Sequence, residues 1–431
     1  MTELPQLIRR KGLDDIMDDY IAGSRQWKLM AMKVYLEQLR LSPLCGYEML
    51  QFSDCLKYEN KNGIVDCFDD DKGIDANWML QMNSDLVLLA DMDKETVYEE
   101  DPVKISLYAS DFLPNPQIHG DLQVLLDGEA ICEGKDFLLA GGLQKLADLE
   151  IRPKAAGSAQ KHILSVQFTS KELNVQNSWA IWSYPRLDAK YNCESDVFVT
   201  DKLNETVFEE LDSGKTVVLF YEHNAPRNTW QFQGAMERFK PCIWDRGSNL
   251  GGIIHSLALQ EALASGRYFD LNMQALLEQG SKVNLDSFPC SVSAFISGID
   301  KPVRDRMKGL AAGIKHFIDE DTLRRFSHLF SVGVGMGTLI VCSLNVSNPE
   351  QPVVSNFLNF LFQNIDFFKT DRAITVDDFR AWLVQENEKG IRKEDIQNHF
   401  WEIDTKLVED MLFWEEVKLD LSSLINPETR G

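Results

Sequence analysis

The chain has 431 residues and a net charge of −23, from 67 acidic and 44 basic side chains. So large an acidic excess disfavours nucleic acids and anionic membrane surfaces as partners, because both are polyanions. The length predicts about two to four domains, each able to bury its own core. No apolar run is long enough to span a membrane, and the 8 scattered cysteines indicate reduced thiols in a cytoplasmic protein.

The first 84 residues predict a helix, a strand and a second helix. A helical pattern at 25–40 leads into the segment PLCGYEMLQFSD at 43–54, where a turn with Pro and Gly precedes an apolar strand. Polar side chains at the carboxyl end of that strand are typical of the mouth of a (β/α)8 barrel. One such unit cannot close a barrel. We therefore expect residues 1–84 to be the end of a barrel whose other strands lie outside this chain.

Short apolar and alternating runs follow, including 103–108, 122–126 and 163–168. Turn signals separate them, among them Asp127-Gly and Glu133-Gly. Short strands at this spacing predict an immunoglobulin-like antiparallel β-sandwich over residues 85–192. We expect Trp179 and Trp182 to pack in its core or against a neighbouring domain.

Strands and helices alternate over residues 193–370. Strands are expected at 197–200, 216–220 and 338–344, and helices at 205–211, 257–264, 271–277, 303–317 and 355–367. This pattern predicts a three-layer α/β domain, amidotransferase-like in outline, with a parallel-rich sheet. Residues 371–431 predict an acidic helical tail in which Leu407, Met411 and Trp414 share one face. The fold class is thus multidomain, α/β plus all-β.

Several segments, in order, resemble glycoside hydrolase family 2, in particular its multidomain β-galactosidase-like branch. The segments SPLCGYEMLQFSD and GIVDCFDDDKGI resemble the last barrel strand and the loop after it. NSWAIWSYPRL resembles the end of the family's β-sandwich, while VFVTDKLNETVFEELDSGKTVVLF, GSKVNLDSFP and GMGTLIVCSLNV resemble its α/β domain. The likeness covers residues 5–365. Two departures are that Gln51 stands where an acid is usual and that LKYEN replaces a Pro-Gly-Gln-Gly loop.

The resemblance implies that the full-length parent hydrolyses terminal β-glycosides, such as β-galactosides, with retention of configuration. Retention requires two carboxyl groups about 5 to 5.5 Å apart. In the family these groups lie at the ends of barrel strands four and seven, which this chain lacks. The acids Asp14, Asp15, Asp18 and Asp19 follow a helical pattern and indicate a solvated face. We therefore expect no catalytic residue, no metal site, no cofactor and no activity from this chain alone.

The remaining candidates for sugar contact are Gln51, Ser53 and Asp54 at the end of the predicted strand. In a complete barrel these side chains would face the substrate. The alternative is that Asp54 caps the loop that follows.

Other motifs favour structural roles. Trp78 is an aromatic side chain of the kind that stacks on sugars, but its helical spacing with Leu80 and Met82 favours packing. The glycine-rich segment at 333–337 lacks the Lys-Ser/Thr of a phosphate-binding loop, which favours a turn that begins a strand. Cys242 and Cys342 lack the glycine elbow of a cysteine nucleophile.

Two further functions remain open. One is a separate subunit that completes a barrel with a chain bearing the amino-terminal half. The other is a non-enzymatic carbohydrate-binding or structural protein. A large apolar patch on residues 1–84 favours the missing partner, whereas a folded cap over 46–54 favours the non-enzyme. Carbohydrate is the expected ligand in each case except a purely structural protein.

Overall fold

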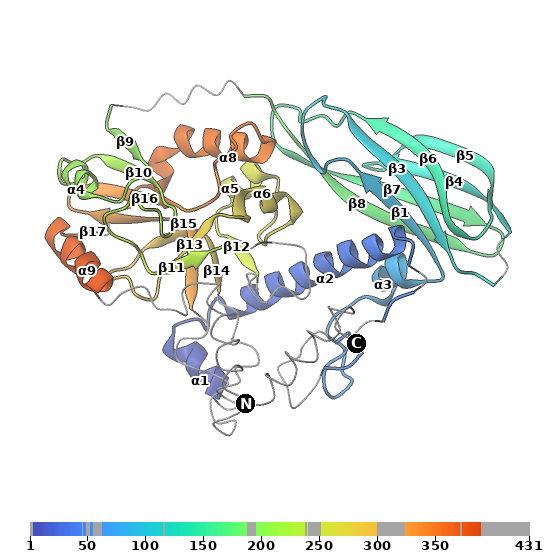
Figure 1. Ribbon diagram of the computed structural model, residues 1–431, viewed down its shortest axis with the longest axis horizontal. Helices are drawn as coiled ribbons and strands as arrows, with labels where there is room; N and C mark the ends of the chain where they lie inside the picture. The colour runs from blue at the N-terminus through green and yellow to red at the C-terminus, as the bar shows by residue number, and fades with distance from the viewer. Residues whose placement is uncertain are drawn as a thin grey trace, which may run out of the picture.

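The computed structural model describes residues 3–44, 46–48, 52–54, 63–114, 117–187, 195–237, 239, 251–299, 324–370 and 373–388. These residues form a β-sandwich and an α/β domain that lie side by side, with the long helix α2 (Met17–Leu41) running along both (Figure 1). Within this part of the chain, no helix combines the length and apolar character that crossing a membrane requires.

The amino-terminal region is helical. It contains α1 (Glu3–Arg10), α2 and α3 (Ala76–Asn83). The predicted strand at 46–54 is not formed in its described residues, 46–48 and 52–54, where the only pairing is a single bridge from Ser53 to Val65. Met49, Leu50 and Gln51 lie outside the described residues. In the described part of the region, no barrel closes.

Helix α2 packs against both domains because its two halves bury different contacts. In the amino-terminal half, the rings of Trp27 and Phe239 lie 4.0 Å apart. In the carboxyl-terminal half, the buried carboxylate of Glu37 contacts strand β8 (Asn174–Tyr184). The expectation of a solvated acidic face at the start of this helix is wrong for Asp19, which pairs with Arg267 of the α/β domain at 2.9 Å.

The described residues of the sandwich form eight strands in two sheets, and the strands predicted at 103–108, 122–126 and 163–168 are confirmed. One sheet has the order β1-β3-β6 and the other β2-β8-β7-β4-β5. Hydrophobic side chains alternate along the strands and fill the space between the sheets, as in β3, where Val103, Ile105 and Leu107 are buried. The strands besides β8 are β1 (Leu86–Met92), β2 (Thr96–Tyr98), β3 (Val103–Asp111), β4 (Ile118–Leu126), β5 (Glu129–Leu139), β6 (Gly142–Ile151) and β7 (Gln160–Ser170).

The α/β domain begins with the predicted strand–helix–strand unit. Its elements are β9 (Val197–Thr200), α4 (Glu205–Asp212), β10 (Thr216–Phe220), β11 (Gly234–Met236), β12 (Gly252–Ile254), α5 (Leu257–Leu263), η1 (Leu271–Met273), α6 (Gln274–Leu277), β13 (Ser281–Asn284), β14 (Ser293–Ile299), β15 (Arg325–Val334), β16 (Gly337–Cys342), α8 (Pro352–Gln363), η2 (Ile365–Phe368), β17 (Ala373–Ile374) and α9 (Val376–Glu388). The helix expected at 303–317 and most of the tail expected at 371–431, including Leu407, Met411 and Trp414, lie outside the described residues.

The sheet of this domain is mixed, so the prediction of a parallel-rich sheet is wrong. Neighbouring described strands are parallel in the pairs β9–β10, β10–β16 and β15–β17, and antiparallel in the other five pairs. The cause is local. Gly335 and Met336 join β15 to β16 as a two-residue hairpin, and the positive φ of Gly335, 62°, suits that turn. The glycine-rich segment is therefore a turn that begins a strand, as predicted.

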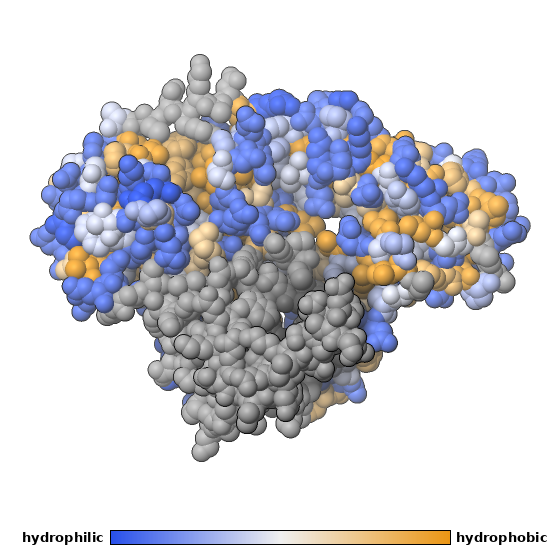
Figure 2. All heavy atoms as spheres, in the orientation of Figure 1, coloured by the Kyte–Doolittle hydropathy of each residue, from blue (hydrophilic) through white to orange (hydrophobic). Residues whose placement is uncertain are grey.

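Helices cover both faces of this sheet, which makes three layers (Figure 1). On β10, Val217 and Leu219 belong to the core that contains side chains of α4 and α9, whereas Val218 belongs to the core with α5, α6 and α8. Trp182 and Tyr184 at the end of β8 join this second core. The prediction of Trp182 as a packing residue between domains is thus confirmed. Figure 2 shows a mostly hydrophilic surface on the α/β domain and larger hydrophobic areas on the sandwich.

Candidate functional site

The side chains predicted to contact sugar lie in a loop that other residues hold in place. Gln51 lies outside the described residues. The Ser53 hydroxyl donates to a carboxylate oxygen of Asp69 at 2.5 Å. The Asp54 carboxylate is buried and accepts hydrogen bonds from the Gly63 backbone N–H at 2.8 Å and from the Lys72 ammonium at 2.9 Å. These contacts support the alternative prediction, in which Asp54 caps the loop that follows it.

Two lysines tie this loop to α2. The ammonium groups of Lys28, on α2, and Lys72 both donate to the Gly63 carbonyl at 2.9 Å. Burial, together with the nearby positive charge of Lys72, lowers the pKa of Lys28 to about 8. Trp78 packs with Met32, Leu36 and Met82, as its spacing predicted. The polar atoms of Ser53 and Asp54 bond other protein groups. Sugar contact by these two residues stays a prediction.

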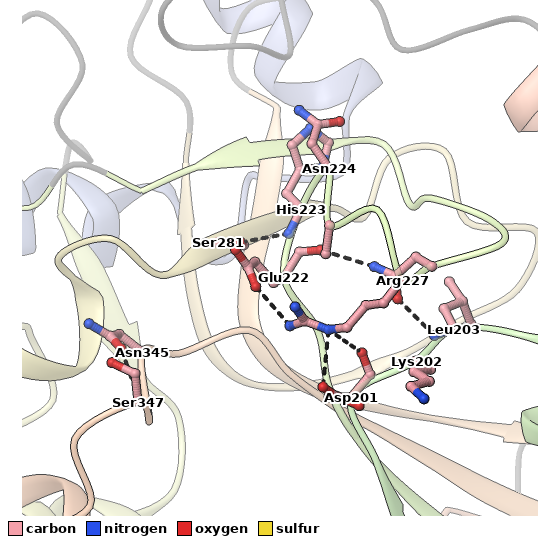
Figure 3. A network of polar contacts seen from close by, with 12 residues as sticks. Asp201, Lys202, Leu203, Glu222, His223, Asn224, Arg227, Ser281, Asn345 and Ser347 are labelled. Atoms are coloured by element: carbon pink, nitrogen blue, oxygen red, sulfur yellow. Dashed lines mark hydrogen bonds and ion pairs between the residues drawn. The ribbon is translucent and has the colours of Figure 1, made fainter.

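A second polar cluster lies where the parallel strands of the α/β domain end (Figure 3). Open α/β sheets commonly bind ligands at the carboxyl ends of their strands. Arg227 connects two of these ends, since its guanidinium bonds Glu222 after β10 at 2.7 Å and the carbonyl of Asp201 after β9 at 3.0 Å. Asn345 and Ser347, after β16, bond each other. The Arg227 contacts fix the two strand ends relative to each other.

His223 is the unusual residue of this edge. It is only 3% exposed, and its Nε2 atom has no hydrogen-bond partner among the described residues. Burial lowers its pKa to about 4, so the ring is neutral at pH 7. Its backbone N–H donates to the Ser281 hydroxyl at 2.9 Å (Figure 3). Within the described part of the chain, its ring contacts the Tyr221 hydroxyl at 3.4 Å and no serine, threonine or cysteine nucleophile.

A buried charge cluster under the sheet was missed by sequence reasoning. A carboxylate oxygen of Glu237 lies 3.4 Å from His328 Nε2 and 3.7 Å from the Lys282 ammonium. His328 Nδ1 donates to the carbonyl of Ser281 at 3.0 Å. Burial lowers the pKa of His328, and the charge of Glu237 opposes that effect. No local motif signals this cluster, because its members come from three distant segments that only the folded sheet brings together.

A cavity of about 360 Å³ lies between α2, the sandwich and the α/β domain. Its size lies near the lower end of the range of roughly 300 to 1,000 Å³ for small-molecule pockets. Carboxylates, lysines and two tryptophans line it, among them Glu95, Asp270, Lys161 and Trp182. Among the described residues, no group of three or more His, Cys, Asp or Glu side chains is arranged to hold a metal ion.

No protein-family model matches the sequence, and no curated protein is similar to it in sequence. Weak structural neighbours include bacterial β-glucuronidases. The enzyme from Parabacteroides merdae is 11% identical, covers 31% of this chain and 21% of its own, and gives a TM-score of 0.19. A calcium-binding mutant of Bacteroides uniformis β-glucuronidase 2 is 13% identical, covers 61% and 28%, and gives 0.19.

A CARDB domain from Pyrococcus furiosus, in complex with di-metal ions, is also similar. It is 10% identical, covers 24% of this chain and 94% of its own, and gives a TM-score of 0.20. The chain spans less than a third of the length of the glucuronidases that it matches. At these identities and TM-scores, the likeness to any of these proteins is distant.

Proposed function

We propose that this chain is the non-catalytic carboxyl-terminal part of a family 2-type glycoside hydrolase, and that it works with a (β/α)8 barrel on another stretch of polypeptide. The complete enzyme would hydrolyse terminal β-glycosides, such as β-galactosides, with retention. The order of the described units supports this proposal. A helical region, a β-sandwich and a three-layer α/β domain follow one another, as the resembling segments do.

The observation that carries the proposal is the exposed apolar surface of the amino-terminal region. Leu44, Phe52, Phe68 and Leu80 are 53%, 66%, 66% and 54% exposed. Leu44 also lines a groove of about 270 Å³ with Phe112 of the sandwich, which is 54% exposed. Concentrations of exposed large apolar side chains commonly mark surfaces that a partner covers. A barrel packed on this region would bury them.

The chemistry of the same region supports a non-catalytic role for this chain. Retaining hydrolysis needs a nucleophile and an acid/base about 5 to 5.5 Å apart. Asp54, the acid at the end of the predicted barrel strand, is instead bonded to Lys72 and Gly63. We therefore assign the chemistry to carboxylates of the barrel.

A reconstitution experiment tests the proposal. The purified chain is assayed on a panel of nitrophenyl β-glycosides, alone and mixed with a family 2-type barrel polypeptide truncated before its last strand. We expect no turnover from the chain alone, and a complex by light scattering together with turnover from the mixture. Turnover by the chain alone would contradict the non-catalytic assignment. Absence of a complex would contradict the partner assignment.

Matched variants locate the surface that binds the barrel. Leu44→Glu and Phe52→Glu place a charge in the exposed apolar region and should weaken the complex. Leu257→Glu is the control, because Leu257 is 74% exposed on α5, in the α/β domain. Equal weakening by all three variants would show that the amino-terminal region is not the binding surface.

A further inference from the structure

The cavity between α2 and the sandwich is built from rigid elements. Met30, Lys33 and Glu37 of α2 form one wall, and Trp179 and Trp182 of β8 form another. The backbone carbonyl of Glu95 accepts a hydrogen bond from the N–H of Trp182 at 2.7 Å, which fixes Glu95 beside β8. A preformed pocket with apolar walls and a few fixed polar groups is the usual form of a small-molecule site.

Most charges in this cavity are already paired with one another. The Lys33 ammonium pairs with Glu37 and donates to the Asn177 side chain at 2.6 Å. The Lys161 ammonium pairs with Asp270 at 2.6 Å and lies 5.3 Å from the centre of the Trp182 ring. Each pair contributes one positive and one negative charge, so the two pairs leave no net charge for a ligand to balance.

Glu95 is the exception. Its side chain is half-buried and lines the cavity, yet no hydrogen bond or ion pair joins its carboxyl group to another described residue. Asp91, at the exposed end of the lining, adds a second acid, whose carboxyl group no hydrogen bond or ion pair joins to another described residue. The side chains of Gln26, Gln38 and Ser178 also line the cavity without bonding any other described side chain. The uncommitted groups are thus two carboxyls, two amides and one hydroxyl.

These groups define the chemistry of a fitting ligand. A partly desolvated carboxylate is costly to leave unpaired, and a cation placed against it relieves that cost. Amide and hydroxyl groups donate and accept hydrogen bonds, which suits ligand hydroxyls. We propose that the cavity binds a small hydroxylated amine, whose ammonium pairs with Glu95 and whose hydroxyls bond Gln26, Gln38 and Ser178. This proposal does not depend on the proposed function, since it concerns other residues.

The electrostatics of Glu95 agree with this assignment. Burial raises its pKa, and the negative charges of Asp270 and Glu37 raise it further. Lys33 and Lys161 face the same space, but each is held by its own acid. A protonated carboxyl attracts an ammonium less than a carboxylate does. Binding of the amine should therefore strengthen as pH rises through the pKa of Glu95.

Glucamine and sorbitol are matched probes, because they share one carbon skeleton and differ by an amine in place of a hydroxyl. A primary alkyl amine stays protonated between about pH 5 and pH 8. Calorimetric titration at pH 7 should show that glucamine binds on the order of tenfold or more tightly than sorbitol. Glu95→Gln keeps the shape and removes the charge, so glucamine binding should fall by a similar factor. Glu99→Gln, outside the cavity, should leave it unchanged.

Two readouts separate binding from folding. Thermal unfolding should show that Glu95→Gln is at least as stable as the parent, because the substitution removes an unpaired charge. In NMR spectra, glucamine should shift the indole N–H signals of Trp179 and Trp182 and leave that of Trp382, outside the cavity lining, in place. Equal binding of sorbitol, glucamine binding that survives Glu95→Gln, or no binding of either probe would each overturn the proposal.

Discussion

The indole N–H of Trp179 donates a hydrogen bond of 2.9 Å to the carboxylate of Glu37, and this contact joins β8 of the sandwich to α2. The other oxygen of the same carboxylate accepts from the Asn177 amide at 2.7 Å and pairs with Lys33. Glu37 is 7% exposed, so this set of bonds is shielded from water. Because α2 also packs on the α/β domain, Glu37 helps to hold the two domains in one arrangement.

Replacing Glu37 with alanine should therefore destabilise the protein strongly. The substitution leaves the Lys33 ammonium, the Asn177 amide and the Trp179 N–H without their shared acceptor. Breaking a buried ion pair from one side costs about 3–5 kcal/mol. Urea unfolding followed by tryptophan fluorescence measures the change. Glu129→Ala on exposed strand β5 is the control and should lie within about 0.5 kcal/mol of the parent. A loss below about 1 kcal/mol for Glu37→Ala would show that the contact is not a major anchor.

Two glycines at the start of strand β12 leave no room for a side chain, one against Phe269 and the other against α2. A Cβ on Gly252 would lie 1.8 Å from a ring carbon of Phe269, and one on Gly251 would lie 2.3 Å from the backbone nitrogen of Ser24. Gly252→Ala should thus destabilise the domain by about 1–3 kcal/mol, because Phe269 must leave its place in the core. Gly266→Ala, with no heavy atom within 4 Å of the new Cβ, should be neutral or slightly stabilising. Equal stability of the two variants would contradict the close contact.

Local patterns predicted several of the regular elements, although not every one: the strand expected at 46–54 is not formed in its described residues. Strands β9 and β10 begin and end at the predicted residues, because each is a short apolar run that turn residues bound on both sides. The helical pattern at 25–40 likewise found α2, which extends further toward the amino terminus. In each case the signal lies within one segment, so periodicity alone is sufficient.

Partners distant in the sequence could not be predicted. The sheet is mixed because the order and direction of β11 to β15 depend on pairing between segments that share no local motif. The bonds of Asp54 to Lys72, and the assembly of Glu237 with His328, depend on tertiary contacts in the same way. Glu95 is a related case. Only the folded chain shows that Glu95 lines a cavity and that no hydrogen bond or ion pair joins its carboxyl group to another described residue.

Asp54→Asn distinguishes a loop role from sugar contact. If Asp54 holds the loop, the loss of its charge weakens the bonds to Lys72 and Gly63, and stability should fall by about 1–3 kcal/mol. Asp212→Asn, at an exposed position at the end of α4, is the control and should change little. The measurements are urea unfolding of the chain and glycoside turnover by the reconstituted complex. Unchanged stability with lost turnover would instead favour substrate contact by Asp54.

His223 should make the protein less stable in mild acid. Burial lowers its folded-state pKa to about 4, whereas an unfolded chain has the ordinary value of about 6.5. Between these values the unfolded state binds a proton that the folded state excludes, so the free energy of unfolding falls as pH decreases. The contribution of one such group is at most about 1.4 kcal/mol per pH unit. Burial also lowers the pKa of His255 and His328, which adds to the effect in the same direction.

The slope of stability against pH isolates the part due to His223. Urea unfolding is measured at about pH 7, 6 and 5, which lie on both sides of the unfolded histidine pKa of about 6.5. The free energy of unfolding should fall less on acidification for His223→Gln than for the parent, because glutamine does not titrate. His119→Gln is the control, since the His119 side chain is 60% exposed on β4. Parallel pH profiles for the parent and His223→Gln would show that His223 binds its proton equally well in the folded and unfolded states. The assignment of a buried ring that excludes the proton would then be wrong.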